Sequence, residues 1–336
     1  MNGNNKWKWQ LPFLLFLIIA TVLIIRHRQP RNIPFQRSEG MVFGTVWHAT
    51  YQSDSALSHS IMQELSRVDA SLSMFNPKST VSRINSGESE ETDSLFRMVF
   101  TQAQQISEAT NGCFDITVAP LVNAWGFGFK KGELPDSSQV DSLLRFVGWD
   151  KLTLEGNLLH MSDPRMVLDF SAIAKGFGVD QVASLMRRKG ISNFMIEIGG
   201  EIVVSGHNPK GEKWSIGVNK PVEDSTSPNQ EVETILHLTD CAMATSGNYR
   251  NFYISPDGRK LSHTIDPHSG RPVQHSILSS TVVAPTCSMA DAFATSFMVM
   301  GLDEAKKVLS KHPELQALFI YSDENKELKI WKNLSE

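Results

Sequence analysis

The sequence has few cysteines and little excess charge, and both shortages exclude classes of protein. Its 336 residues include only three cysteines, Cys113, Cys241 and Cys287, with no C-x-x-C pair among them. An odd, widely spaced set argues against a disulfide framework and against a cysteine-ligated metal site. The formal net charge is −4, so the chain lacks the basic excess typical of nucleic-acid-binding domains. Nucleic acid is therefore not an expected partner.

The N-terminal region lacks the small residues that mark a cleaved signal peptide. An apolar run covers 11–25, interrupted by one proline and one threonine, and basic residues flank it on both sides. No A-x-A-like arrangement follows the run. Counted from Trp9, about 17 apolar or interfacial residues reach the lower limit for crossing a bilayer. The pattern predicts a transmembrane anchor or uncleaved signal over residues 1–28, of undetermined orientation, and a linker over 29–40.

The rest of the chain lacks a regular alternation of strand and helix. β-branched and aromatic residues predict a strand over 41–51. Apolar residues at helical spacing predict amphipathic helices over about 53–72 and 93–112. The second half reads mostly as strands, with helices near 288–300 and 303–311. This grouping, without an internal repeat, predicts an α+β fold and not a doubly wound sheet.

The segment LDFSAIAKGFGVD, residues 168–180, contains residues suited to an anion. A strand is expected to end at Asp169 and a helix to begin near Ala172. Free backbone N–H groups and Lys175 would then lie where a phosphate could be held. Asp169 or Ser171 could equally be an ordinary N-cap, and Lys175 an ordinary solvated charge. Both interpretations stay open for this segment by itself.

Two later segments combine turn formers with chemically active side chains. HTIDPHSGRP, residues 263–272, predicts a turn around two histidines and one arginine. His263 is a candidate general base, and a polar histidine at a strand end is an equally suitable description. ATSGNYRNF, residues 244–252, places a tight turn beside Arg250, which suits a ligand site or any hairpin.

The apolar segment CSMADAFATSFMVMG, residues 287–301, carries Asp291 and Thr295 at i, i+4 spacing. In a helix this spacing puts both side chains on one face. Asp291 could complement the dipole of its own helix in the first turn, and Thr295 could bond back to a carbonyl. Alternatively, the two oxygens could bind Mg²⁺, a hard cation that takes few protein ligands together with phosphate oxygens. The segment alone does not decide between these accounts.

Eight segments, in this order, resemble the ApbE family of FAD:protein FMN transferases. They run from about residue 41 to 320 and are FGTVWHATY, SMFNPKSTVSRIN, GCFDITVAPLVNAWGFG, LDFSAIAKGFGVD, EIGGEIVVSG, ATSGNYRNF, HTIDPHSGRPV and ADAFATSF. For residues 41–336 the resemblance implies an α+β, T-fold-like architecture with mixed or antiparallel sheets flanked by helices.

The resemblance also implies an activity. It is Mg²⁺-dependent transfer of FMN from FAD to a threonine or serine hydroxyl, with release of AMP. The implied acceptor is a membrane flavoprotein with an Asp-Gly-Ala-Thr-like segment. The implied location is the bacterial inner membrane, with the catalytic domain facing the periplasm.

The resemblance implies roles for individual residues. His263 matches the catalytic base, and the metal ligands match Asp291, Thr295 and the backbone carbonyl of Ala172. The FAD-contacting positions are Phe43, Phe75, Cys113, Phe114, Asp115, Asp169, Lys175, Ser246, Gly247 and Ile265.

The sequence departs from the family pattern at two positions. Phe43 stands where the family usually has a methionine, so an aromatic face would replace a thioether. Ala294 stands where some members have an aspartate, which removes one potential ligand.

Two other functions remain open. One is a Mg²⁺-dependent FAD pyrophosphatase that uses water as the acceptor and releases free FMN and AMP, because the same site would serve both reactions. The other is a non-catalytic, membrane-tethered flavin-binding protein. The presence together of Lys175, His263, Asp291 and Thr295 speaks against the latter.

Overall fold

The computed structural model describes residues 7–28, 33–128, 134–221, 232–248, 252–254, 258, 260–274, 276–325 and 327–334. The chain divides into two compact units, Met1–Pro34 and Phe35–Glu336. The first contains helix α1, Trp7–Arg28. Within the described part of the chain, no helix has both the length and the hydropathy needed to cross a bilayer. The predicted membrane anchor over residues 1–28 is not found there.

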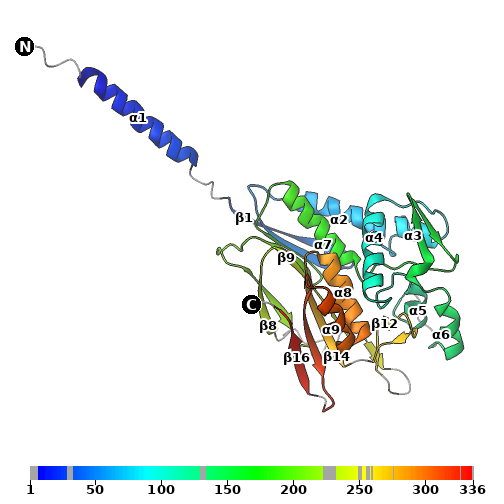
Figure 1. The fold of residues 1–336 in the computed structure, drawn as a ribbon. Helices are drawn as coiled ribbons and strands as arrows, with labels where there is room; N and C mark the ends of the chain where they lie inside the picture. Colours follow the sequence, from blue (N-terminus) through cyan, green and yellow to red (C-terminus); the bar gives the residue numbers. More distant parts are fainter. Residues whose placement is uncertain are drawn as a thin grey trace, which may run out of the picture. The chain divides into compact units, whose positions relative to one another are not determined.

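The second unit is built around one eight-stranded antiparallel sheet (Figure 1). Its strands, in spatial order, are β1 (Phe35–Val42), β2 (Thr45–Gln52), β5 (Phe194–Ile198), β6 (Glu201–Ser205), β9 (Cys241–Gly247), β14 (Ile277–Ala284), β15 (Gln316–Ser322) and β16 (Leu328–Lys332). Four two-stranded pairs accompany it: β3–β4 (Leu152–Glu155, Leu158–Met161), β7–β8 (Trp214–Asn219, Val232–Leu238), β10–β11 (Phe252–Ile254, Lys260–Ser262) and β12–β13 (Ile265–Asp266, Arg271–Pro272).

Helices flank this sheet, which confirms the predicted α+β class (Figure 1). The described helices of the second unit are α2 (Ser58–Leu72), α3 (Thr80–Asn85), α4 (Ser94–Ala109), α5 (Ala119–Ala124), α6 (Ser137–Leu144), α7 (Ala174–Arg188), α8 (Cys287–Met300) and α9 (Leu302–Lys311), with a 3₁₀ turn at Trp149–Lys151.

The central strands of the large sheet are apolar on both faces. On β15, Ala317 and Phe319 pack into the core formed with α4 and α8, while Leu318 and Ile320 pack against β7. Successive side chains of a strand point to opposite faces, so such a strand must be covered twice. Helices therefore cover one face and the β7–β8 hairpin covers the other.

The first hairpin differs from the prediction. Strand β1 begins at Phe35, inside the predicted linker of 29–40, and residues 29–32 lie outside the described part. The predicted strand over 41–51 covers the end of β1 and most of β2, joined by a two-residue turn at Phe43 and Gly44. Both turn residues have positive φ, 50° and 74°, as a type I′ turn requires. The first part of β1 was not predicted as a strand, because β1 is a mostly polar, half-exposed edge strand.

Helices α7 and α8 make close backbone contact, and this contact sets up the site. A Cβ on Gly176 would overlap the carbonyl group of Cys287, so only glycine fits there. Asp180 of α7 accepts hydrogen bonds from the backbone N–H groups of Cys287 and Ser288, at 2.8 and 2.9 Å. Because these donors belong to the first turn of α8, Asp180 fixes the beginning of α8 against α7.

Candidate functional site

A cavity of about 680 Å³ lies where the beginning of α7, the middle of α8 and the ends of several strands meet. Its size falls within the roughly 300–1,000 Å³ of small-molecule sites. The described residues that line it include every predicted site residue except Phe43: Phe75, Cys113, Phe114, Asp115, Asp169, Ala172, Lys175, Ser246, Gly247, His263, Ile265, Asp291 and Thr295. Residues spread over more than 200 positions of the sequence, from Phe75 to Thr295, thus share one cavity.

Phe43 lies away from this lining. Its ring lies against α7, where a Cβ on Gly178 would come within 2.8 Å of it. The ring packs against two apolar clusters of the core. In this structure Phe43 is a packing residue outside the cavity lining.

Asp291 caps a helix, but not its own. Helix α8 is capped by Thr286, whose hydroxyl accepts from the N–H of Met289, and it has no acidic residue in its first turn. The interpretation of Asp291 as a charge complementing its own dipole is therefore wrong. Its Oδ2 instead accepts the N–H of Gly176, at 3.0 Å, in the first turn of α7. Burial raises the pKa of this carboxyl, and the nearby charge of Lys175 acts in the opposite direction.

Thr295 points to β9 and not back along its helix. Its hydroxyl lies 2.9 Å from the hydroxyl of Ser246. The back-bonded residue is the neighbouring Ser296, whose hydroxyl donates to the carbonyl of Ala292 at 2.7 Å. The Thr295 hydroxyl therefore stays at the cavity wall, one turn along α8 from Asp291.

Lys175 forms an ion pair that the sequence did not predict. Its Nζ lies 2.5 Å from Oε1 of Glu201, a residue only 3% exposed. Burial lowers the pKa of Lys175, but the charges of Asp291 and Glu201 outweigh it, so that the pKa is raised. Burial and the charge of Asp291 raise the pKa of Glu201 to about 8, against the lowering effect of Lys175.

A tight turn sets the position of Glu201 at the start of β6. Gly199 and Gly200, both at positive φ, join β5 to β6 and make Glu201 the first residue of β6. Its second oxygen, Oε2, is buried and has no hydrogen-bond partner among the described residues. In the sequence, Glu201 begins the mostly apolar stretch EIVVS, which is typical of a buried strand. Because a glutamate is almost never fully buried without a partner, this position could have indicated an ion pair.

Two aspartates of the cavity lining, Asp115 and Asp169, accept hydrogen bonds from groups near them in the fold. Asp115 accepts from the N–H and hydroxyl of Thr117, at 2.7 and 2.6 Å, and from the N–H of Trp149 at 3.0 Å. Asp169 accepts from the N–H of Ser171 at 2.8 Å, so it caps the turn before α7. Helix α7 begins at Ala174 after Ile173 and has no side-chain cap, so the predicted N-cap role of Asp169 or Ser171 is wrong.

His263 and Cys113 stand on the same lining. The ring of His263 meets that of Phe127 edge to face, with centroids 6.5 Å apart. Burial, followed by the charges of Asp266 and Glu304, raises the pKa of the Cys113 thiol to about 11. A raised pKa disfavours the thiolate, which is the reactive form of cysteine. Arg250 and its neighbours lie outside the described residues.

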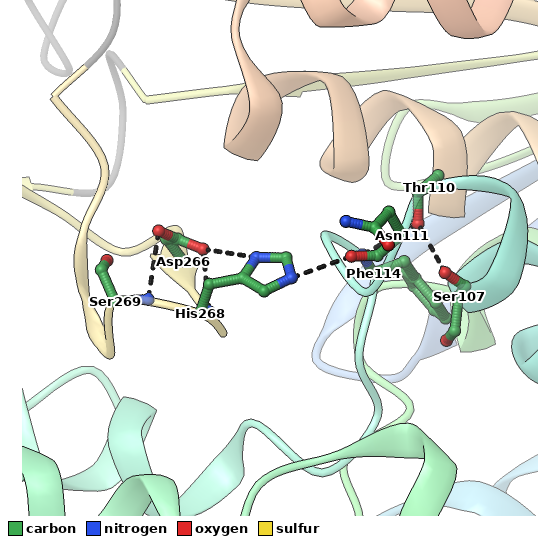
Figure 2. A network of polar contacts seen from close by, with 7 residues as sticks. All are labelled: Ser107, Thr110, Asn111, Phe114, Asp266, His268 and Ser269. Carbon is green, nitrogen blue, oxygen red and sulfur yellow. Dashed lines mark hydrogen bonds and ion pairs between the residues drawn. The ribbon is translucent and has the colours of Figure 1, made fainter.

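A histidine links two turns of the cavity wall. Figure 2 shows His268, in the turn between β12 and β13, reaching across to the turn that follows α4. Its Nε2 lies 2.8 Å from the carbonyl oxygen of Asn111, and its Nδ1 lies 3.3 Å from Oδ1 of Asp266. A Cβ on Gly112 would come within 3.2 Å of the ring, so glycine leaves room for it. The link joins the segment of Ile265 to that of Cys113.

No cluster of three or more His, Cys, Asp or Glu side chains suited to a metal occurs in the described part of the chain. The predicted magnesium ligands are of another composition: one carboxylate, one hydroxyl and one backbone carbonyl, all on the cavity lining. All three are oxygen donors, the type that Mg²⁺ prefers.

Comparison with known proteins gives consistent results. The model of the ApbE family matches residues 43–319. The FAD:protein FMN transferase of Haemophilus influenzae is 36% identical over 317 residues, covering 88% of this chain and 90% of that protein. The FAD:protein FMN transferase of Vibrio cholerae is 38% identical over 280 residues, covering 80% and 82%.

Solved structures agree with these relatives. The flavin transferase ApbE from Vibrio cholerae superimposes with a TM-score of 0.79 at 34% identity, covering 89% of this chain and 97% of its own. The apo flavinyl transferase ApbE from Pseudomonas stutzeri gives the same TM-score at 27% identity, covering 89% and 94%.

Proposed function

The chain belongs to the ApbE family, and we propose that it transfers FMN from FAD to a threonine or serine hydroxyl of an acceptor protein, releasing AMP. The observation that carries the proposal is the shared cavity. Lys175, His263 and Asp291, which come from distant parts of the sequence, line one space of about 680 Å³. The names of the relatives support the same reaction.

The reaction requires that negative charge be neutralised. The acceptor oxygen attacks the phosphorus of the FMN half, a P–O bond forms, and the bond to the bridging oxygen breaks with its electron pair leaving on AMP. Charge is spread over the phosphate oxygens throughout such a transfer. Lys175 brings a positive charge to the cavity, and the beginning of α7 brings the positive end of a helix dipole.

His263 is the proposed general base. In this role a nitrogen of its imidazole accepts the proton of the acceptor hydroxyl as the new P–O bond forms. The edge-to-face contact with Phe127 restricts the ring. Base and cationic group then stand on one lining, as the reaction needs.

The donor set fits a magnesium ion. Asp291 would supply a carboxylate, Thr295 a hydroxyl and Ala172 a backbone carbonyl. Because Gly176 occupies only Oδ2 of Asp291, the other carboxylate oxygen is available. A bound Mg²⁺ would act as a Lewis acid on phosphate oxygens. Removal of the metal with EDTA should stop transfer, and added Mg²⁺ should restore it.

The decisive experiment combines purified protein, FAD, Mg²⁺ and an acceptor carrying an Asp-Gly-Ala-Thr-like segment. Flavin fluorescence that stays with the acceptor on a denaturing gel, together with AMP release, is the expected result. Free FMN with no labelled acceptor would instead indicate a pyrophosphatase. The absence of AMP would leave only a flavin-binding protein.

The variant His263→Ala tests the proposed base. We expect FAD affinity to remain close to that of the wild type, while transfer falls about 100-fold or more, the usual contribution of a general base. His48→Ala, at an exposed histidine of β2, is the control and should transfer normally. Wild-type transfer by the His263 variant would contradict the assignment.

Acceptor and location belong to the same proposal. We propose a membrane flavoprotein as the acceptor and the periplasmic side of the inner membrane as the site of action. Both rest on the sequence and on the family resemblance. Cell fractionation, with protease access to intact spheroplasts, measures the location directly.

A further inference from the structure

Two buried carboxylates share one ammonium group on the cavity wall. Nζ of Lys175 lies 2.5 Å from Oε1 of Glu201, and Gly176, the next residue along α7, donates its N–H to Oδ2 of Asp291 at 3.0 Å, so that Lys175 and Asp291 stand on one cavity lining. Both carboxylates are almost fully buried, with Glu201 at 3% and Asp291 at 4% exposure. The two acids therefore compete for the same positive charge.

This competition matters because Asp291 is the one charged group in the proposed magnesium site. An ammonium paired with Asp291 would satisfy its charge and would repel a divalent cation. Lysine has a long, flexible stem, so its charge can move between nearby carboxylates. If a metal is to bind at Asp291, some feature of the structure must keep the ammonium group of Lys175 away from that carboxylate.

Glu201 has the properties that this task requires. As the first residue of β6, directly after the Gly199–Gly200 turn, it is fixed by strand pairing with β5. Its side chain is buried, whereas that of Lys175 is 35% exposed and has more freedom. The rigid partner therefore determines where the mobile one lies.

We propose that Glu201 is a positioning residue that holds Lys175 away from Asp291 and so keeps the Asp291 carboxylate available for a divalent cation. This inference rests on the proposed metal dependence. Loss of Glu201 lets Lys175 turn to Asp291, and the cation then binds more weakly. At high cation concentration the cation displaces Lys175 again.

The test measures cation binding directly, without FAD and without turnover, at pH 8.5 under anaerobic conditions, where Glu201, with its pKa raised to about 8, is mostly ionised. Mn²⁺ replaces Mg²⁺, and water-proton relaxation gives its dissociation constant for the full chain. In Glu201→Gln the shape is kept and the charge is lost. We expect the dissociation constant to rise about tenfold or more, as for other groups that support metal ligands. Thermal unfolding checks that the variant is folded.

The control is Glu304→Gln. Glu304 forms the same kind of pair, with Lys307 at 2.6 Å, but both side chains are exposed and neither lines the cavity. Its loss should leave Mn²⁺ affinity unchanged. The control separates the loss of a lysine partner at the site from the loss of one acidic group on the protein.

A second comparison shows whether Glu201 acts through Lys175. Lys175→Met should improve Mn²⁺ affinity more in the Glu201→Gln background than in the wild type, since only there is the ammonium free to occupy Asp291. An equal improvement in both backgrounds overturns the inference, and so does unchanged Mn²⁺ affinity in Glu201→Gln. A wild-type protein that binds no Mn²⁺ overturns the proposed metal dependence as well.

Discussion

At the scale of single residues, Gly176 leaves no room for one added carbon between α7 and the backbone of α8. A Cβ at this position would overlap the carbonyl of Cys287 and lie 2.8 Å from the backbone N of Ser288. Inside an ordinary exposed helix, Gly→Ala stabilises by about 1 kcal/mol. We expect Gly176→Ala to destabilise instead, by roughly 1–3 kcal/mol, because backbone atoms cannot move aside easily. Urea unfolding measures this difference.

Gly178→Ala is the matched control, two residues further along the same helix. Its added Cβ would meet the ring of Phe43 at 2.8 Å, and a side chain can rotate away where a backbone cannot. We therefore expect a smaller loss of stability than for Gly176→Ala, with FAD affinity less affected. If Gly176→Ala stabilised the protein, the close contact of α7 with α8 would not be as the structure has it.

The contacts of Asp291 show what a sequence gives at this scale and what it does not. Periodicity alone places Asp291 and Thr295 on one helix face. It does not reveal that Asp291 accepts from Gly176, 115 residues earlier. Glu201 was missed for the same reason, since its ion pair with Lys175 depends on the packing of α7 against β6 and not on either local sequence.

At the scale of elements, the link made by His268 holds two turns of the cavity wall together. Its ring bridges Asp266 and the carbonyl of Asn111. His268→Ala removes both interactions, each worth about 1 kcal/mol. We expect faster amide hydrogen exchange in residues 263–270 and 110–114, weaker FAD binding by severalfold, and a loss of global stability of about 2 kcal/mol at most. Hydrogen exchange followed by mass spectrometry measures the first effect.

The control for this link is His160→Ala. His160 lies on β4, is about as exposed as His268, and stands near Glu90 and Glu155 outside the cavity lining. Exchange in the two wall segments should be unchanged in this variant. Equal exchange in His268→Ala and the wild type would mean that the turns hold their places without the link.

Elements with strong periodicity or clear caps could be predicted. The spacing of Ile61, Leu65 and Val68 correctly predicted α2, although the helix begins at Ser58 and not near residue 53. Asp93 begins α4 as expected, accepting two backbone N–H groups. The short strands β12 and β13 could not be predicted, because their pairing depends on the turn that His268 and Asp266 stabilise.

At the scale of the whole molecule, the order of strands brings the site together. β6, β9 and β14 are neighbours in the sheet but distant in the sequence, and α8 packs against β9. No local pattern fixes such an order. The resemblance of eight ordered segments to one family implied the arrangement, so the shared cavity could be predicted. The ion pair of Lys175 with Glu201 could not be predicted in this way.

The buried acids also make the stability of the whole molecule depend on pH. The pKa of Glu201 is raised from 4.5 to about 8 in the folded chain. The stability linked to this group is therefore fully present below about pH 4.5 and is lost as pH rises through about 8.

Glu201→Gln removes the titrating group while keeping its shape. Relative to the wild type, the metal-free variant should gain thermal stability as pH rises from 5 to 8.5. Glu304→Gln controls for the substitution itself. Melting temperatures measured across this range check the trend, and a difference between variant and wild type that does not change with pH would show that Glu201 is ionised throughout.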